Sequence, residues 1–92
     1  MNEKHFALLG KPAKDKVTGF SGIITSISFD LYGCIQAVIT PPTDKEGMPK
    51  DGHWFDVTRV DITKNKAVMQ PPDYEAGYIA EGRKGAALKP LP

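Results

Sequence analysis

The sequence predicts a small all-β protein, a barrel or roll of about five short strands. Residues 22–29 alternate with a period of two and are rich in isoleucine, threonine and phenylalanine, which favour strands. Nine glycines and eight prolines punctuate the chain at short intervals. Almost no helix is indicated, and 92 residues bury only a modest core. We therefore expect one simple β domain, closed because a small open sheet would expose its edges.

The first half of the chain predicts three strands separated by two turns. Thr18-Gly19 supplies turn chemistry, and Gly33 is free to take a positive φ angle between two apolar runs. The short connection around Gly33 makes the flanking strands an antiparallel hairpin at the centre of the sheet. The expected elements are a strand at residues 9–15, a turn at 16–19, a strand at 22–29, a break at 30–33 and a strand at 34–39.

The second half begins with a long charged loop, "PPTDKEGMPKDGH", whose prolines cannot donate to a strand ladder. Alternation resumes in "HWFDVTRVDI", where residues 56–59 are expected to form a tight turn before a last short strand. A further turn is expected at residues 64–66, and residues 67–69 are expected to return along the barrel edge. The expected inward set of this half is Trp54, Val57, Val60 and Ile62.

The clustering of glycine and proline divides the chain into a core-building domain, residues 1–69, and a C-terminal tail, residues 70–92. The tail shows neither the helical nor the strand period, so we expect it to be extended. Several of its apolar residues are able to dock if a second subunit offers a surface. No internal repeat is visible.

Composition limits the class of partner. Twelve Lys and Arg against 11 Asp and Glu give a net charge of +1, which supplies no long-range field to attract a polyanion. The single cysteine cannot form an internal disulfide, and no export signal or membrane-spanning apolar run is visible. We expect a cytoplasmic protein of a reducing compartment, without a membrane partner and with nucleic acid disfavoured.

Three motifs together resemble a family of small uncharacterised proteins of tailed phages and prophages. They are "KDKVTGFSG" at residues 14–22, "LYGC" at residues 31–34 and "WFD" at residues 54–56, with a Lys/Asp/Gly loop before the last. The tail is also of the kind seen there, so the resemblance covers most of the chain. It implies a small SH3-like barrel and carries no known activity. Association with phage genes favours proteins that disable host factors or sequester host signalling molecules.

Cys34 allows a nucleophile hypothesis, in which His5 or His53 is the base and Asp30 or Asp56 orients it. The alternative is a buried structural cysteine at the start of a strand. We favour the structural alternative, because the sequence supplies neither a glycine-flanked elbow nor a helix N-terminus to lower the thiol pKa.

The sequence gives little indication of metal binding, of phosphate binding or of catalysis by its Asp and Thr side chains. The histidines and the cysteine lack the short-spaced pairs of zinc sites, and "TGFSG" is not a phosphate-binding motif, so no metal or cofactor is expected. Asp15 with Thr18, and Asp56 with Thr58, lie near turns, where such side chains cap backbone amides. We therefore predict no enzymatic activity.

Aromatic and basic residues at strand ends and turns are the best candidates for a binding surface. Alternation sends Trp54 and Phe55 to opposite faces, so one of them must be exposed or covered by a partner. Phe20 and one of that pair must face inward for so small a core to exist. The predicted partner-binding residues are Phe20, Asp30, Tyr32, Trp54, Phe55 and Arg59.

Together these features predict a non-enzymatic, homo-oligomeric binding protein of phage or prophage type. It would act in counter-defence by sequestering a host protein or a small nucleotide-like signal, the latter in a pocket between subunits. The alternative is a nucleic-acid or nucleoprotein adaptor of a mobile element, which a steep loss of binding with salt would distinguish.

Overall fold

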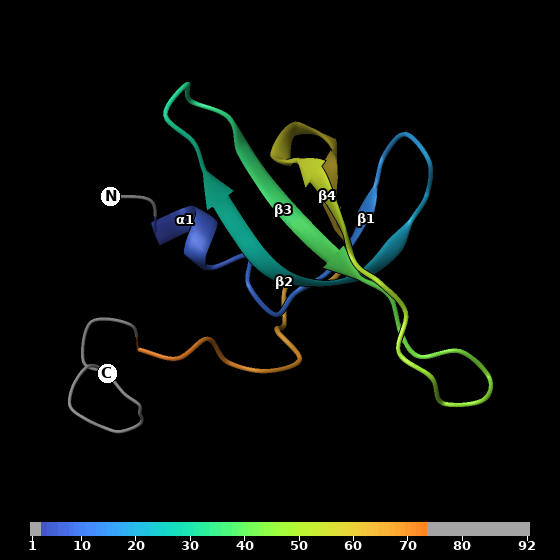
Figure 1. The fold of residues 1–92 in the computed structure, drawn as a ribbon. Coiled ribbons are helices and arrows are strands. Elements are labelled where there is room, and N and C mark those ends of the chain that lie inside the picture. The colour runs from blue at the N-terminus through green and yellow to red at the C-terminus, as the bar shows by residue number, and fades with distance from the viewer. Residues whose placement is uncertain (1–2, 74–92) are drawn as a thin grey trace, which may run out of the picture.

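The computed structural model describes residues 3–73, and these form a small antiparallel β structure (Figure 1). The prediction of an all-β fold of about five strands is confirmed. Part of the predicted tail, residues 74–92, lies outside the described residues. The elements are α1 (Glu3–Phe6), β1 (Pro12–Asp15), β2 (Ser21–Phe29), β3 (Ile35–Thr40), β4 (His53–Asp56), the 3-10 helix η1 (Val57–Arg59) and β5 (Val60–Ile62).

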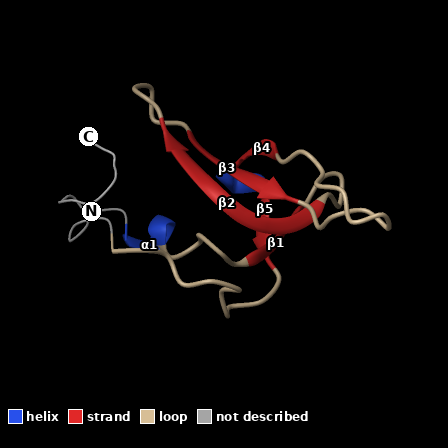
Figure 2. Ribbon diagram, turned by 60° about the horizontal axis from the view of Figure 1, so that its bottom comes forward, coloured by secondary structure: helices blue, strands red, loops and turns tan. Residues whose placement is uncertain are grey.

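The five strands form one sheet in the order β4-β3-β2-β1-β5, with every neighbouring pair antiparallel. The closure expected of an SH3-like barrel is not confirmed, because β4 and β5 lie at opposite edges of this sheet. Figure 2 shows the sheet bent along β2, its nine-residue strand, with α1 beside the sheet. Within residues 3–73, no helix is long and apolar enough to cross a bilayer.

A β-bulge explains which side chains of β2 reach the core. Ile24 pairs with Ile39, but the next pair is Ser26 with Val38, so Thr25 is an extra residue between them. Ile24 is consequently buried and Ile27, three residues on, also packs against the core. The strict alternation expected for residues 22–29 is therefore broken at Thr25.

The core is small and lies on one face of the sheet. Ala37 of β3 pairs with Phe55 of β4, and both side chains are buried. The expectation that Trp54 faces inward is wrong: Phe55 is 9% exposed and Trp54 is 52% exposed. The predicted alternative, one of the two inside and one outside, is confirmed. The buried residues are Ala13, Ile24, Ala37, Ile39 and Phe55, and Leu8, Leu9, Phe20, Ile27, Val60 and Ile62 pack against them.

The segments that precede β1 and follow β5 differ from the prediction. The first strand begins at Pro12 rather than residue 9, because the backbone before it forms turns in which Leu8 N–H donates to His5 O and Lys11 N–H to Leu8 O. The short helix α1 was not predicted. Residues 67–69 do return beside the sheet, where Val68 N–H donates to Gly10 O, but they form no strand.

Candidate functional site: the tip of the β2–β3 hairpin

The connection between β2 and β3, residues 30–34, is a closed turn that we call the tip. The Asp30 carboxylate oxygen Oδ1 accepts the backbone N–H of Tyr32 and of Cys34, each at 2.9 Å. Asp30 N–H donates to Cys34 O at 3.0 Å, and Gly33 N–H to Asp30 O at 3.2 Å. Gly33 has φ +92°, a conformation that a side chain disfavours. Asp30, predicted as a partner-binding residue, thus shapes the turn.

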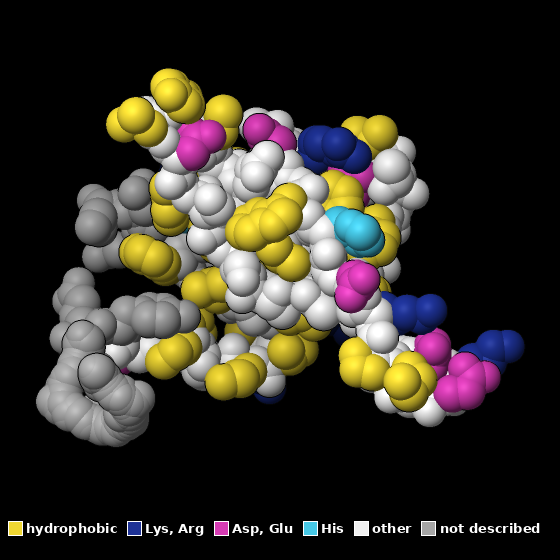
Figure 3. Space-filling view, in the orientation of Figure 1, with side chains coloured by type: hydrophobic (Ala, Val, Ile, Leu, Met, Phe, Trp, Pro, Cys, Tyr) yellow, Lys and Arg dark blue, Asp and Glu magenta, His cyan; other side chains and the backbone are white. Residues whose placement is uncertain are grey.

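Two large side chains project from this fixed turn. Leu31 is 90% exposed and Tyr32 is 88% exposed, the highest values among the large apolar residues described. Figure 3 shows hydrophobic side chains gathered at the tip, above β2 and β3. A scattered exposed apolar residue needs no explanation, but here two adjacent ones project from a turn that four hydrogen bonds hold in one conformation.

The hairpin that carries the tip is almost free of charge. Between Lys16 and Asp44, Asp30 is the only charged residue. A surface meant for phosphate would need cations. An apolar, nearly uncharged tip suits instead a neutral, apolar cleft, where little desolvation of charge opposes binding.

Cys34 lies in the tip and is exposed, so the prediction of a buried structural cysteine is wrong. The tip extends past the core, which leaves the thiol mostly uncovered. The neighbouring Asp30 carboxylate, together with partial burial and a hydrogen bond from the thiol to it, raises the pKa of Cys34 above its ordinary value. A nucleophilic cysteine needs the opposite shift, so the local field disfavours the thiolate.

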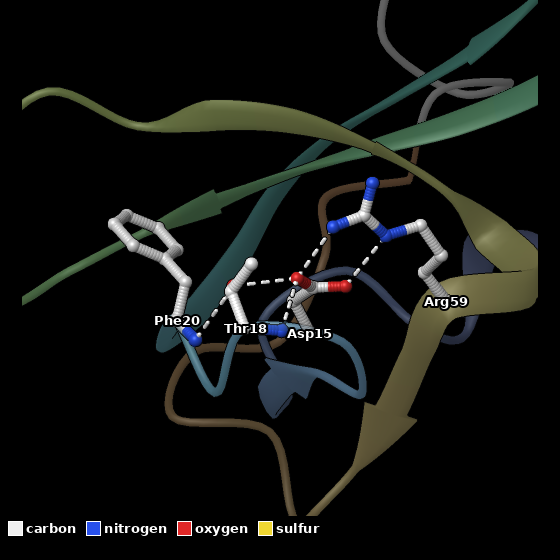
Figure 4. A network of polar contacts seen from close by, with 4 residues as sticks. All are labelled: Asp15, Thr18, Phe20 and Arg59. Atoms are coloured by element: carbon white, nitrogen blue, oxygen red, sulfur yellow. Dashed lines mark hydrogen bonds and ion pairs between the residues drawn. The ribbon is translucent and has the colours of Figure 1, made fainter.

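A second group of polar residues forms a clamp between β1 and η1 (Figure 4). Arg59 donates from Nε to Asp15 Oδ1 at 2.7 Å and from Nη2 to Asp15 Oδ2 at 2.6 Å. Thr18 donates to Asp15 Oδ2 from its backbone N–H at 2.9 Å and from its hydroxyl at 2.6 Å. The predicted capping of a local amide by Asp15 is confirmed, and so is that by Asp56, which accepts from Thr58 N–H at 2.9 Å.

The clamp defines the position of Arg59, a predicted partner-binding residue. Asp15 is fully buried, and the Arg59 side chain is 40% exposed and lies over the Phe55 ring at 5.3 Å from its centroid. The guanidinium is the main reason that the pKa of Asp15 lies well below its ordinary value, and the same hydrogen bond raises the pKa of Arg59. A buried carboxylate without such a partner would be costly, so the pair is first of all structural.

The remaining predicted residues fall in two places. Phe20 packs against Phe55, with ring centroids 5.5 Å apart, and against His53 at 5.4 Å, so it belongs to the edge of the core. Trp54 lies on the opposite face of β4, where its strand partner is Val38. The structure therefore places Asp30 and Tyr32 in the tip and Trp54 on the outer face of β4. Phe20 and Phe55 lie in and beside the core, and Arg59 lies in the clamp. Sequence reasoning missed Leu31, whose only signal is its place beside Tyr32 in the turn.

A shallow apolar groove lies at the other end of the hairpin. It encloses about 530 Å³ and spans the start of β2, the end of β3 and the flanking ends of β1 and β5. Its position follows from the pairing of Ile23 with both Pro12 and Thr40, which brings these three lining residues side by side. No charged residue lines it.

Metal ligands do not gather in the described part of the chain: residues 3–73 contain no group of three or more histidine, cysteine or acidic side chains placed to hold an ion. Comparison with protein-family models, with curated proteins and with solved structures found no match. The resemblance to phage and prophage proteins stays a prediction from the sequence motifs.

Proposed function

We propose that this chain is a non-catalytic protein-binding module that docks through the tip of its β2–β3 hairpin. The observation that carries the proposal is the near-complete exposure of Leu31 and Tyr32 on a turn fixed by the Asp30 carboxylate. A rigid turn loses little conformational entropy on binding, and aromatic side chains are common anchors at interfaces. The partner is a protein with an apolar cleft able to enclose a leucine and a tyrosine side chain.

The chemistry of the tip favours a protein over the other partners expected from the sequence. A small nucleotide-like signal or a nucleic acid carries phosphate, whereas the one charge in the tip is the carboxylate of Asp30. The guanidinium of Arg59 already makes two hydrogen bonds to Asp15. In the proposed setting, which rests on the phage-type motifs, the module binds a host protein in the bacterial cytoplasm and thereby disables it.

The single cysteine allows a direct test, because it lies in the tip and is exposed. A photo-crosslinking maleimide attached to Cys34 should join the chain to one bacterial protein on illumination of a cell extract. Replacing both Leu31 and Tyr32 with serine should abolish that product. The matched control, Val17→Ser, removes an exposed apolar side chain from a different turn and should leave the product unchanged.

Three results would count against the proposal. They are the absence of any crosslinked protein, a product that persists in the doubly substituted tip, and an equal product when the reagent is carried by Val17→Cys in a Cys34→Ser background. Circular dichroism of each variant would show that the sheet is intact, so that loss of the product reports on the tip.

A further inference from the structure

The net charge of +1 conceals an uneven distribution of charge over the fold. Two segments, residues 10–16 with β1 and residues 59–68 with β5, lie antiparallel beside each other. We call them together the basic edge, because β5 is an edge strand of the sheet. Each segment carries three cationic residues: Lys11, Lys14 and Lys16 on the first, and Arg59, Lys64 and Lys66 on the second.

Backbone contacts hold the two segments of the basic edge together from one end to the other. At one end, Lys16 N–H donates to Arg59 O at 2.7 Å. At the other end, Val68 N–H donates to Gly10 O at 2.8 Å, and the β1–β5 register lies between these two bonds. The seven residues of the first segment span about 20 Å when extended. The cations therefore follow a stripe of about that length, two chain segments wide.

The lysines of the basic edge are available to a partner, whereas Arg59 is bound to Asp15 and its charge is cancelled there. Within residues 3–73, none of these lysines forms an ion pair. The other carboxylate of the edge is Asp61, so five lysines and one carboxylate leave a net charge of +4. Four of the lysines are exposed and the last is half-buried: Lys14, Lys16, Lys64, Lys66 and Lys11.

The rest of the described chain carries the opposite charge. Outside the basic edge, residues 3–73 contain three lysines and seven carboxylates, which gives a net charge of −4. A polyanion is therefore attracted little from a distance, as the total charge predicts, but at close range it is favoured at this one edge of the sheet.

We propose that the basic edge binds the phosphate backbone of a double-stranded nucleic acid. Ammonium groups bind phosphate as point charges, and a narrow stripe of them matches a linear polyanion. Protein interfaces, by contrast, are depleted in lysine and enriched in aromatic residues and arginine. The basic edge contains no aromatic residue on which the bases of a single strand could stack. Contacts to the backbone carry no sequence information, so binding is expected at any sequence.

The test measures fluorescence anisotropy of a labelled DNA duplex of about 20 base pairs as the full chain is added. If four lysines each neutralise one phosphate, the logarithm of the binding constant should fall with the logarithm of salt with a slope of about −3.6. Raising the salt from about 50 to about 200 mM should then weaken binding about a hundredfold. An RNA duplex of the same sequence is the second arm: binding of either duplex supports the inference, and the tighter one identifies the source of the backbone.

Paired lysine variants locate the contact. Lys14→Gln with Lys64→Gln should weaken binding at low salt at least about tenfold and reduce the slope by about two. The matched control, Lys4→Gln with Lys45→Gln, removes two exposed lysines from outside the basic edge and should bind like the wild type. The net charge changes equally in both, and the basic residues of the tail are unchanged. Lys16→Gln with Lys66→Gln is the second pair if circular dichroism shows that the first does not fold.

The inference is overturned if neither duplex binds at about 50 mM salt, or if both lysine pairs weaken binding equally. It is also overturned if vesicles containing phosphatidylserine bind more tightly than either duplex with the same dependence on the lysines. The basic edge uses neither Leu31 nor Tyr32, so the inference goes beyond the proposed function and is tested separately from it. Serine at both tip positions should leave duplex binding unchanged, and Lys14→Gln with Lys64→Gln should leave the crosslinked bacterial product unchanged.

Discussion

Replacing Phe55 with alanine should remove a large share of the stability of this domain, whereas the same change at Trp54 should be mild. Phe55 is 9% exposed and packs against Phe20 and beneath Arg59. Truncating a buried phenylalanine typically costs about 3–5 kcal/mol, part of it for the cavity left behind. A domain of this size has roughly 4–10 kcal/mol in total. The variant should therefore lose about a third of its stability or more.

Trp54 provides the matched comparison, because it is the next residue in the same strand. At 52% exposure it buries about half of its side chain, against Val38 and its neighbours on the outer face. Full burial of a large apolar side chain contributes about 1.5–3 kcal/mol, so losing half of this contribution costs about 1 kcal/mol.

Urea denaturation followed by circular dichroism measures both variants on the same scale. With a slope near 1 kcal/mol per molar urea for a small protein, Phe55→Ala should lower the midpoint by about 3–5 M and Trp54→Ala by about 1 M. Equal losses for the two variants, or a larger loss for Trp54→Ala, would show that the outer face is buried and would refute the orientation of β4. As the single tryptophan, Trp54 gives a second check: its fluorescence should be quenched readily by acrylamide in the folded protein.

Three further predictions follow from single contacts. Gly22→Ala should destabilise the sheet more than Gly19→Ala, since an added Cβ at residue 22 would overlap the backbone oxygen of Thr40, whereas residue 19 has open space and the cost there is only that of a side chain at φ +81°; paired urea midpoints would decide it. Asp15→Asn should flatten the acid side of the stability curve. The lowered pKa of Asp15 means that its contribution is complete above the ordinary carboxyl pKa and is lost as pH falls through the folded value. Unfolding at stepped pH should therefore find a steeper slope in the wild type than in the variant, where Asp56, whose pKa is also lowered, supplies the slope that remains. Asp30→Asn should speed the reaction of Cys34 with a disulfide reagent at pH 8, because the carboxylate raises the thiol pKa; an unchanged rate would contradict that origin.

The strands can be predicted well from the sequence because the turns and caps that bound them form between residues only a few positions apart. The turn at Gly33, the cap at Asp56 and the proline-terminated end of β3 all use groups close in the chain. The bulge at Thr25 escapes such signals, since an extra residue is needed only where the sheet bends over its core. Under strict alternation, Ile24 and Ile27 would point to opposite faces of the sheet. The inserted residue turns Ile27 to the same face as Ile24, where both pack in the core.

The candidate site was harder to predict because exposure is a property of the whole fold. Nothing near Cys34 in the sequence says that the tip extends past the core, so the usual burial of cysteine misled the prediction. Arg59 and Asp15 are 44 residues apart, and their pairing depends on η1 being placed beside β1. In the sequence alone, Arg59 is a cation at a turn with no visible partner, and that is typical of a binding residue. Its partner, Asp15, is revealed only by the fold.

The tip separates the residues that make its shape from the residues that it displays. Asp30 and Gly33 close the turn, and neither needs Leu31 or Tyr32 to be apolar. Polar residues at those two positions would fold as well and would expose less apolar surface, so stability does not account for them. The groove is different, because the close approach of Gly22 to the end of β3 is required by the sheet itself. Changes at the tip should therefore alter binding with little effect on folding, whereas the groove can be altered without unfolding only at exposed side chains such as Thr63.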